Sequence, residues 1–334
     1  MKKVLLLLLI PFFCGCANKS GAEKTQNKRN NIISVRGETK EIPIDDVLIG
    51  SIARLFLMDN YLIIVDHTSS DKLIHIFTKN DFSYLTSIAD VGQGPGEITV
   101  MGHIGINEAC RKFYVSDHGK QKIFSYDIDS VLINPYYMPE VKTEMNMIQF
   151  PDKYEYMSDT LSVAILIEPT SVSTFNQSLA KWNINSGIFE PMKYQHPDIE
   201  KKRINFAASI KHNMYVECYH YYDLMTICSL EGDLKYNIYG PAWNKKVTNR
   251  ILYYNGVRFC GDKIVASYSG GANFTDEKYP TKFEVFDIDG NYLCTLETGY
   301  KIVDFCYDED YDRIIMNLND EIQFAYLDLK DVKL

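Results

Sequence analysis

The chain has 334 residues, is 46% hydrophobic and 13% aromatic, and carries a formal net charge of −9. Its 24 Tyr and 17 Phe far outnumber its 2 Trp, a composition that favours strands over helices. An acidic chain without a long basic stretch in its folded region argues against nucleic acid, or an anionic bilayer surface, as a partner of that region.

The first 16 residues form a signal segment rather than part of the fold. Lys2 and Lys3 precede an apolar stretch over residues 4–10 that is too short to span a bilayer as a helix. The segment ends in Phe13-Cys14-Gly15-Cys16, which resembles the lipobox of bacterial lipoproteins, whose last Cys is lipidated and becomes the mature N-terminus. The resemblance implies lipid attachment at Cys16 and a firm membrane anchor. An ordinary cleaved signal peptide, with Cys16 incidental, is the alternative.

Residues 17–31 are polar and show no apolar periodicity. They predict a flexible tether between the membrane and the fold. No acidic run follows Cys16, so the expected location is the cell envelope, on the outer membrane and facing the periplasm.

A repeat of about 50 residues organises the rest of the chain. Tyr61–Val65 and Lys72–Phe77 are apolar runs joined by a polar loop, which predicts strands buried on both faces. Counterparts of Val65 recur in steps of 50, 50, 51, 49 and 50 residues, at Val115, Ile165, Val216, Val265 and Ile315. A period this steady and of this length indicates a propeller or a solenoid.

Each repeat has the pattern of a propeller blade. The first predicts four strands, at Ile52–Met58, Tyr61–Val65, Lys72–Phe77 and Tyr84–Ala89. The last repeat has three strands, and an unassigned apolar segment, Ile32–Ile44, precedes the first repeat. We therefore predict an all-β, six-bladed β-propeller of four-stranded blades over residues 32–334. Ile32–Ile44 would close the ring as the outer strand of the last blade.

This architecture predicts a ligand face. Loops between second and third strands, and loops that join successive blades, lie on the same face of such a ring. The polar and aromatic residues expected there are Asp66, His67, Gln93, Glu97, Asp117, His118, His220 and Tyr221. A concave channel mouth with such loops is a usual ligand site; solvated loops without a ligand are the alternative.

Motifs for chemistry are few. No H-E-x-x-H and no G-x-S-x-G occurs, and we assign no catalytic residue, metal ligand or cofactor. Two Asp-His pairs, Asp66-His67 and Asp117-His118, together with His220, either hold a metal ion or are loop turns capped by Asp. Residues 92–96 predict a tight crossover rather than a phosphate cradle, because a strand pattern follows them.

Six cysteines lie beyond the signal segment, at Cys110, Cys218, Cys228, Cys260, Cys294 and Cys306. Most lie in strand patterns with apolar neighbours, so we expect buried free thiols, although an exported protein permits disulfides. Cys218 and Cys228 flank one hairpin and are the only local pair that sequence singles out.

The 50-residue strand pattern, the lipobox and the Ala89–Glu97 segment with its GPGE ending together resemble six-bladed β-propeller lipoproteins of the TolB-like and NHL-like type. The resemblance implies a propeller and an envelope location, but no established activity. We therefore predict a membrane-anchored, non-catalytic binding or scaffold module, with one propeller face for a protein, peptide or glycan. The alternative is a hydrolase or lyase, resembling lactonases, with a metal in the central channel. That alternative needs polar side chains from several innermost strands, which here supply few, such as Asn205 and Asp304.

Overall fold

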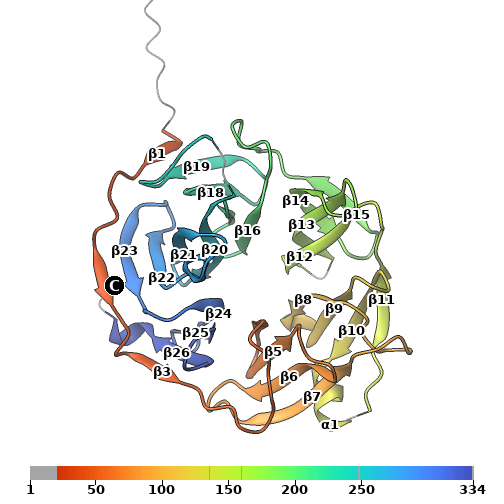
Figure 1. Cartoon of the computed structure of the whole chain (residues 1–334). Helices are drawn as coiled ribbons and strands as arrows, with labels where there is room; N and C mark the ends of the chain where they lie inside the picture. The colour runs from red at the N-terminus through yellow and green to blue at the C-terminus, as the bar shows by residue number, and fades with distance from the viewer. Residues whose placement is uncertain (1–20, 135, 159, 247–248, 333–334) are drawn as a thin grey trace, which may run out of the picture.

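The computed structural model describes residues 21–332 apart from 135, 159, 247 and 248. The predicted signal segment, Cys16 and the start of the tether lie outside the described residues. Six sheets stand around a central axis in chain order (Figure 1). The predicted fold, a six-bladed β-propeller, is confirmed.

The first three blades have four antiparallel strands each, ordered outward from the channel. Blade one is β4 (Ala53–Met58), β5 (Tyr61–Asp66), β6 (Lys72–Thr78) and β7 (Tyr84–Asp90). Blade two is β8 (Met101–Asn107), β9 (Lys112–Asp117), β10 (Lys122–Asp127) and β11 (Glu140–Glu144). Blade three is β12 (Phe150–Tyr156), β13 (Leu161–Pro169), β14 (Phe175–Asn183) and β15 (Ile188–Pro191).

The last three blades each recruit a strand from the N-terminal part of the chain. Blade four is β16 (Ile204–Ser209), β17 (Met214–Tyr219), β18 (Leu224–Ser229), β19 (Leu234–Tyr239) and β1 (Glu23–Thr25). Blade five is β20 (Ile251–Cys260), β21 (Lys263–Ala272), β22 (Lys282–Asp287), β23 (Tyr292–Glu297) and β2 (Ile32–Ser34). Blade six is β24 (Ile302–Asp308), β25 (Arg313–Leu318), β26 (Phe324–Asp328) and β3 (Thr39–Glu41).

The second strands are buried on both faces because every blade packs against two neighbours. In β5, Leu62 and Ile64 belong to an apolar cluster shared with blade six, whereas Ile63 and Val65 belong to one shared with blade two. The six clusters together fill the six interfaces between blades. This alternation explains why the strands read as continuous apolar runs.

The ring is closed as predicted, by an N-terminal strand, but a shorter one than expected. β3 pairs antiparallel with β26 and completes blade six. β2, also within the predicted closing segment, instead pairs in parallel with β23 of blade five.

The expected tether is part of the fold over the residues described. β1 pairs in parallel with β19 of blade four, so residues 21–42, here called the N-terminal strap, run along three successive blades (Figure 1). Arg29 of the strap inserts between blades four and five, where its Nη1 lies 2.9 Å from Asp223 Oδ1 and 2.5 Å from Glu284 Oε2. The side chains of all three residues are buried. A three-residue strand and one buried arginine leave no apolar pattern, which is why sequence predicted a flexible segment.

A short helix, α1 (Ile128–Ile133), follows β10, with Asp127 as its N-cap. Cys218, Cys228, Cys260, Cys294 and Cys306 are buried free thiols as predicted, whereas Cys110 is exposed. Within the described part of the chain, no helix has the length and apolar character needed to cross a membrane.

Candidate functional site

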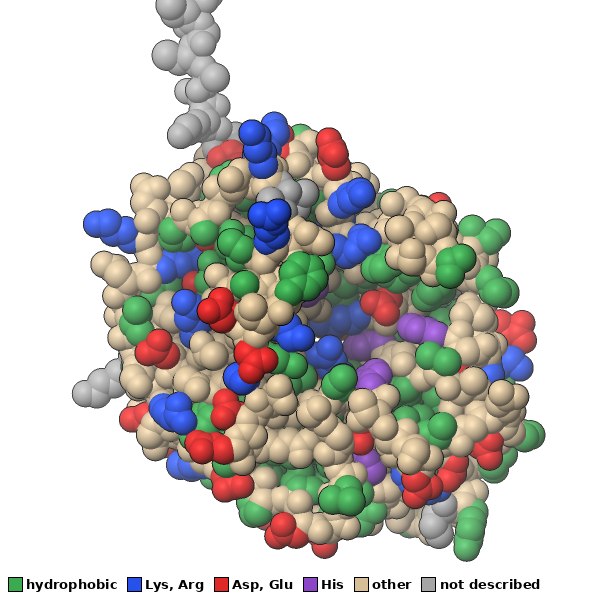
Figure 2. Space-filling view, in the orientation of Figure 1, with side chains coloured by type: hydrophobic (Ala, Val, Ile, Leu, Met, Phe, Trp, Pro, Cys, Tyr) green, Lys and Arg blue, Asp and Glu red, His purple; other side chains and the backbone are tan. Residues whose placement is uncertain are grey.

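A cavity of about 350 Å³ opens in the central channel, and all six blades contribute to its lining. We call it the mouth cavity. Its polar lining residues are Arg54, His67, His103, His118, Asp152, Lys153, Asn205, Asn255, Arg258 and Asp304. The space-filling view shows Lys, Arg and His side chains gathered in the central hollow (Figure 2). The innermost strands thus supply many polar groups, where sequence analysis expected few.

Several of these side chains bind the exposed edge of the next innermost strand. Asp304 accepts a hydrogen bond from Leu55 N at 2.8 Å, and Asn255 Nδ2 donates to Val303 O at 3.1 Å. Asn205 Nδ2 donates to Asn255 O in the same manner. Innermost strands pair on one side only, so these bonds satisfy backbone groups that would otherwise need water.

The positive charges of the cavity are only partly balanced by negatively charged side chains. Asp304 Oδ1 lies 3.7 Å from Arg54 Nη1 and 3.6 Å from Arg258 Nη2, so one carboxylate faces two guanidinium groups. Lys153 Nζ donates to Phe206 O at 3.3 Å. Burial, reinforced by the charge of Arg258, lowers the pKa of Lys153 to about 8. Burial raises the pKa of Asp152, the second carboxyl of the cavity.

The three predicted histidines lie around this cavity. His67 and His118 line it directly, and His118 Nε2 is buried without a hydrogen-bond partner among the described residues. His220 Nε2 lies 3.4 Å from the lining residue Asn205, and its Nδ1 lies 2.7 Å from Tyr254 O. Burial lowers the pKa of His220 to about 4, and burial together with the charge of Arg54 lowers that of His67.

The two predicted aspartates, Asp66 and Asp117, form hydrogen bonds within their own loops and do not line the mouth cavity. Asp117 is buried and accepts hydrogen bonds from four backbone N–H groups, of Thr99, Val100, Gly119 and Lys120, at 2.8 to 3.2 Å. Asp66 is also buried and accepts from Gly50 N, Thr68 N and Thr68 Oγ1. These bonds outweigh burial and hold the pKa of Asp66 below its ordinary value. In both Asp-His pairs the Asp caps the turn of its own loop by hydrogen bonds to backbone N–H groups. The adjacent His67 and His118 line the mouth cavity.

The GPGE segment also forms a self-contained loop. Glu97 accepts a hydrogen bond from Gly94 N at 2.6 Å, and Lys120 Nζ donates to the carbonyls of Gly94 and Glu97 at 2.7 Å. Gln93 is exposed. The Lys120 ammonium and the Glu97 carboxylate both form hydrogen bonds with the backbone of this segment, in keeping with a crossover between blades.

Tyr221, the last residue of the predicted face, is partly buried against the apolar cluster between blades three and four. Its ring centroid lies 6.5 Å from that of His220. It is not among the residues that line the mouth cavity.

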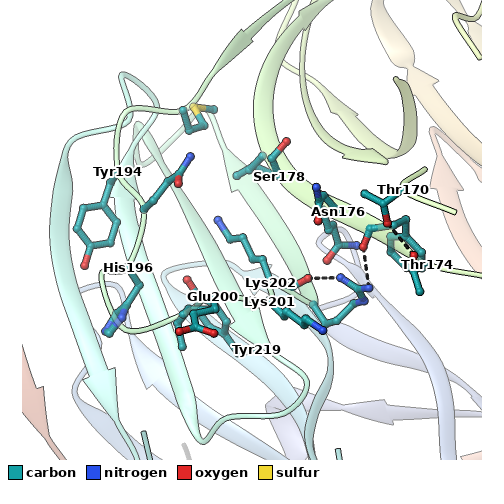
Figure 3. A pocket seen from close by; sticks show the side chains of 17 residues that line it. Thr170, Thr174, Asn176, Ser178, Tyr194, His196, Glu200, Lys201, Lys202 and Tyr219 are labelled. Atoms are coloured by element: carbon teal, nitrogen blue, oxygen red, sulfur yellow. Dashed lines mark hydrogen bonds between the residues drawn. The ribbon is translucent and has the colours of Figure 1, made fainter. Parts of the chain in front are cut away.

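A second cavity of about 360 Å³ lies between blades three and four (Figure 3). Two of its lining cations, Lys202 and Arg203, already have partners. Lys202 Nζ lies 2.6 Å from Glu217 Oε1, and Arg203 donates to Phe175 O at 2.9 Å while its guanidinium lies 3.9 Å from the centroid of that ring. The mouth cavity holds the buried cation Lys153, which forms no ion pair within the described residues, and it is therefore the better candidate for a ligand.

The donor set of the mouth cavity does not fit a divalent cation. Over the described residues, no three His, Cys, Asp or Glu side chains are grouped so that they can hold a metal ion. Three cationic side chains line the cavity beside two carboxylates, and hard cations need several anionic or carbonyl oxygens.

The fold is shared with solved propellers at low sequence identity. A putative exported protein from Bacteroides fragilis is 10% identical, with a TM-score of 0.57 over 92% of this chain and 98% of that one. A DUF4221 family member from Bacteroides vulgatus is 11% identical, with a TM-score of 0.60 over 90% and 98%. A calcium-binding protein, regucalcin, from Agrobacterium tumefaciens is 9% identical, with a TM-score of 0.55 over 89% and 95%.

The family follows from the sequence model that matches residues 38–227, more than half of the chain. The chain belongs to the DUF5128 family, described as a 6-bladed beta-propeller. No curated protein matches.

Proposed function

We propose that this protein is an envelope lipoprotein, of the TolB-like and NHL-like type, whose propeller is a binding module with its ligand site at the mouth cavity. The observation that carries the proposal is the lining of that cavity, to which every blade contributes. A ligand there contacts the whole ring, and a concave polar site on a rigid scaffold is what recognition requires.

The anchor is supported by the lipobox-like sequence at Cys16 and by its proximity to the fold. The described chain begins at Gly21, five residues after Cys16. Five extended residues reach at most about 18 Å, so an acylated Cys16 would keep the rim of blade four near the membrane. A fold neighbour described as a putative exported protein is consistent with an envelope location.

The anchor is tested by Cys16→Ser. We expect the variant to leave the membrane fraction and to lose metabolic labelling with palmitate, because its acylation site is gone. Continued labelling of the Cys16→Ser protein would contradict the proposed anchor.

The binding function is tested by affinity capture from solubilised native envelopes on the full-length protein. A double variant, His67→Ala with His118→Ala, removes two lining side chains. Lys211→Ala is the matched control, since Lys211 is exposed in the turn between β16 and β17, at the opposite end of blade four. We expect a ligand retained by the parent and the control and lost by the double variant. Equal retention by all three proteins would contradict a site at the mouth cavity.

Catalysis with a metal ion in the channel is the second candidate, favoured by the shared fold with a protein described as calcium-binding. The three cationic side chains in the lining of the mouth cavity favour an anion over that ion, which supports the binding module as the function we propose.

A further inference from the structure

The mouth cavity has more positive than negative side chains. Arg54, Lys153 and Arg258 line it, against Asp152 and Asp304. Glu155 lines the cavity at the other end of the channel, as Lys153 and Arg258 also do, and it accepts a hydrogen bond from Ala208 N at 2.7 Å. At the mouth itself, three cationic side chains face two carboxyl groups.

Lys153 is the group with the greatest need of a counter-ion. Within the described part of the chain its ammonium forms no ion pair, and its hydrogen bond to Phe206 O is long, at 3.3 Å. The negative charges of Glu155 and Asp304 act on Lys153 without forming an ion pair with it and offset only part of the effect of its burial, and a buried cation without an ion pair is unfavourable. An anionic ligand would relieve this imbalance, and Arg54 and Arg258 have donors suited to carboxylate or sulfate oxygens.

Further hydrogen-bonding side chains line the cavity beside the three cations. His67, His118 and Asn205 face the same cavity, and His118 Nε2 has no partner in the described structure. Such groups suit hydroxyls rather than further charge. The volume of about 350 Å³ is at the small end of ligand pockets, the size of one sugar ring with its bound water.

We propose that the mouth cavity binds an acidic saccharide, with its carboxylate or sulfate group held between Lys153, Arg54 and Arg258. The inference rests on the proposed binding function and specifies the ligand class for the same site. An acidic ligand needs a positively charged lining, whereas a calcium ion in the channel would need a negatively charged one.

The test is calorimetric titration of the full-length protein, purified in detergent, with three sugars of one size. D-galacturonate carries a carboxylate, galactose 6-sulfate carries a sulfate, and galactose is the neutral control. We expect at least one acid to bind about ten-fold or more tightly than galactose, because ion-paired hydrogen bonds add to those of the hydroxyls. The acidic sugar that binds more tightly shows whether the site prefers a carboxylate or a sulfate.

Three variants connect binding to Lys153. Lys153→Met removes the charge at similar length and should weaken acid binding about ten-fold or more. Lys153→Arg keeps the charge and should retain most of the binding, which separates a charge effect from misfolding. Lys211→Met, outside the mouth cavity in the turn between β16 and β17 and paired with Asp262 at 2.9 Å, should bind as the parent does.

The inference is overturned if galactose binds as well as both acids, if neither acid binds, or if Lys153→Met leaves acid binding unchanged. Capture from envelopes then separates the two proposals. If a captured ligand still depends on His67 and His118, the proposed binding function stands and only the acidic saccharide is ruled out as its ligand.

Discussion

Replacing Arg29 by Met should show how much the N-terminal strap stabilises the ring. Arg29 joins the strap to blades four and five through Asp223 and Glu284, and all three side chains are nearly inaccessible to solvent. Its guanidinium also lies 5.4 Å from the ring centroid of Phe286. Methionine keeps much of the packing volume and removes the charge.

The expected cost follows from the two carboxylates left behind. Breaking a buried ion pair by removal of one partner costs about 3–5 kcal/mol. Asp223 would retain hydrogen bonds from Ala242 N, Tyr254 OH and Tyr268 OH, and Glu284 can take up a proton, so we expect the lower limit, about 3 kcal/mol. For a chain of this size that loss lowers Tm by about 4 °C.

The assay is thermal unfolding by calorimetry at neutral pH, with Lys28→Met as the control because Lys28 is an exposed residue of the same strap. Adding Glu284→Gln to Arg29→Met should recover part of the lost stability, since it removes one unpaired carboxylate. An Arg29→Met protein that melts within about 2 °C of the Lys28→Met protein would refute the reasoning.

Two other predictions concern buried carboxylates. Burial raises the pKa of Glu284 from 4.5 to about 7, so between these values the folded protein binds more protons than the unfolded chain, and stability should fall as pH rises through about 7. Glu284→Gln should flatten this part of the Tm-against-pH curve, and an unchanged slope would argue that Glu284 is ionised throughout. Asp117→Ala should cost about 3 kcal/mol in denaturant unfolding because it leaves buried or partly buried N–H groups without an acceptor. Asp90→Ala, at a solvent-accessible ion pair with Lys72, should cost less than about 1 kcal/mol, and equal effects of the two substitutions would count against the proposed loop role of Asp117.

The amino-acid sequence determined the repeating part of the molecule. An apolar strand that must be covered on both faces recurs about every 50 residues, and only neighbouring copies can cover it, so Val65 and its counterparts predicted the blades and their order. Counting strands in the last repeat predicted closure by an N-terminal strand, which β3 provides.

Only the tertiary structure decided what the N-terminal strap and the channel do. Arg29 appeared to lie in a flexible segment because its two carboxylate partners are 194 and 255 positions away in the sequence. Arg54, Lys153 and Arg258 are each the only cation in their own strand, and no local pattern connects residues from different repeats. The closed ring brings their first strands around one axis, so the shared charge of the mouth cavity is a property of the ring and not of any single blade.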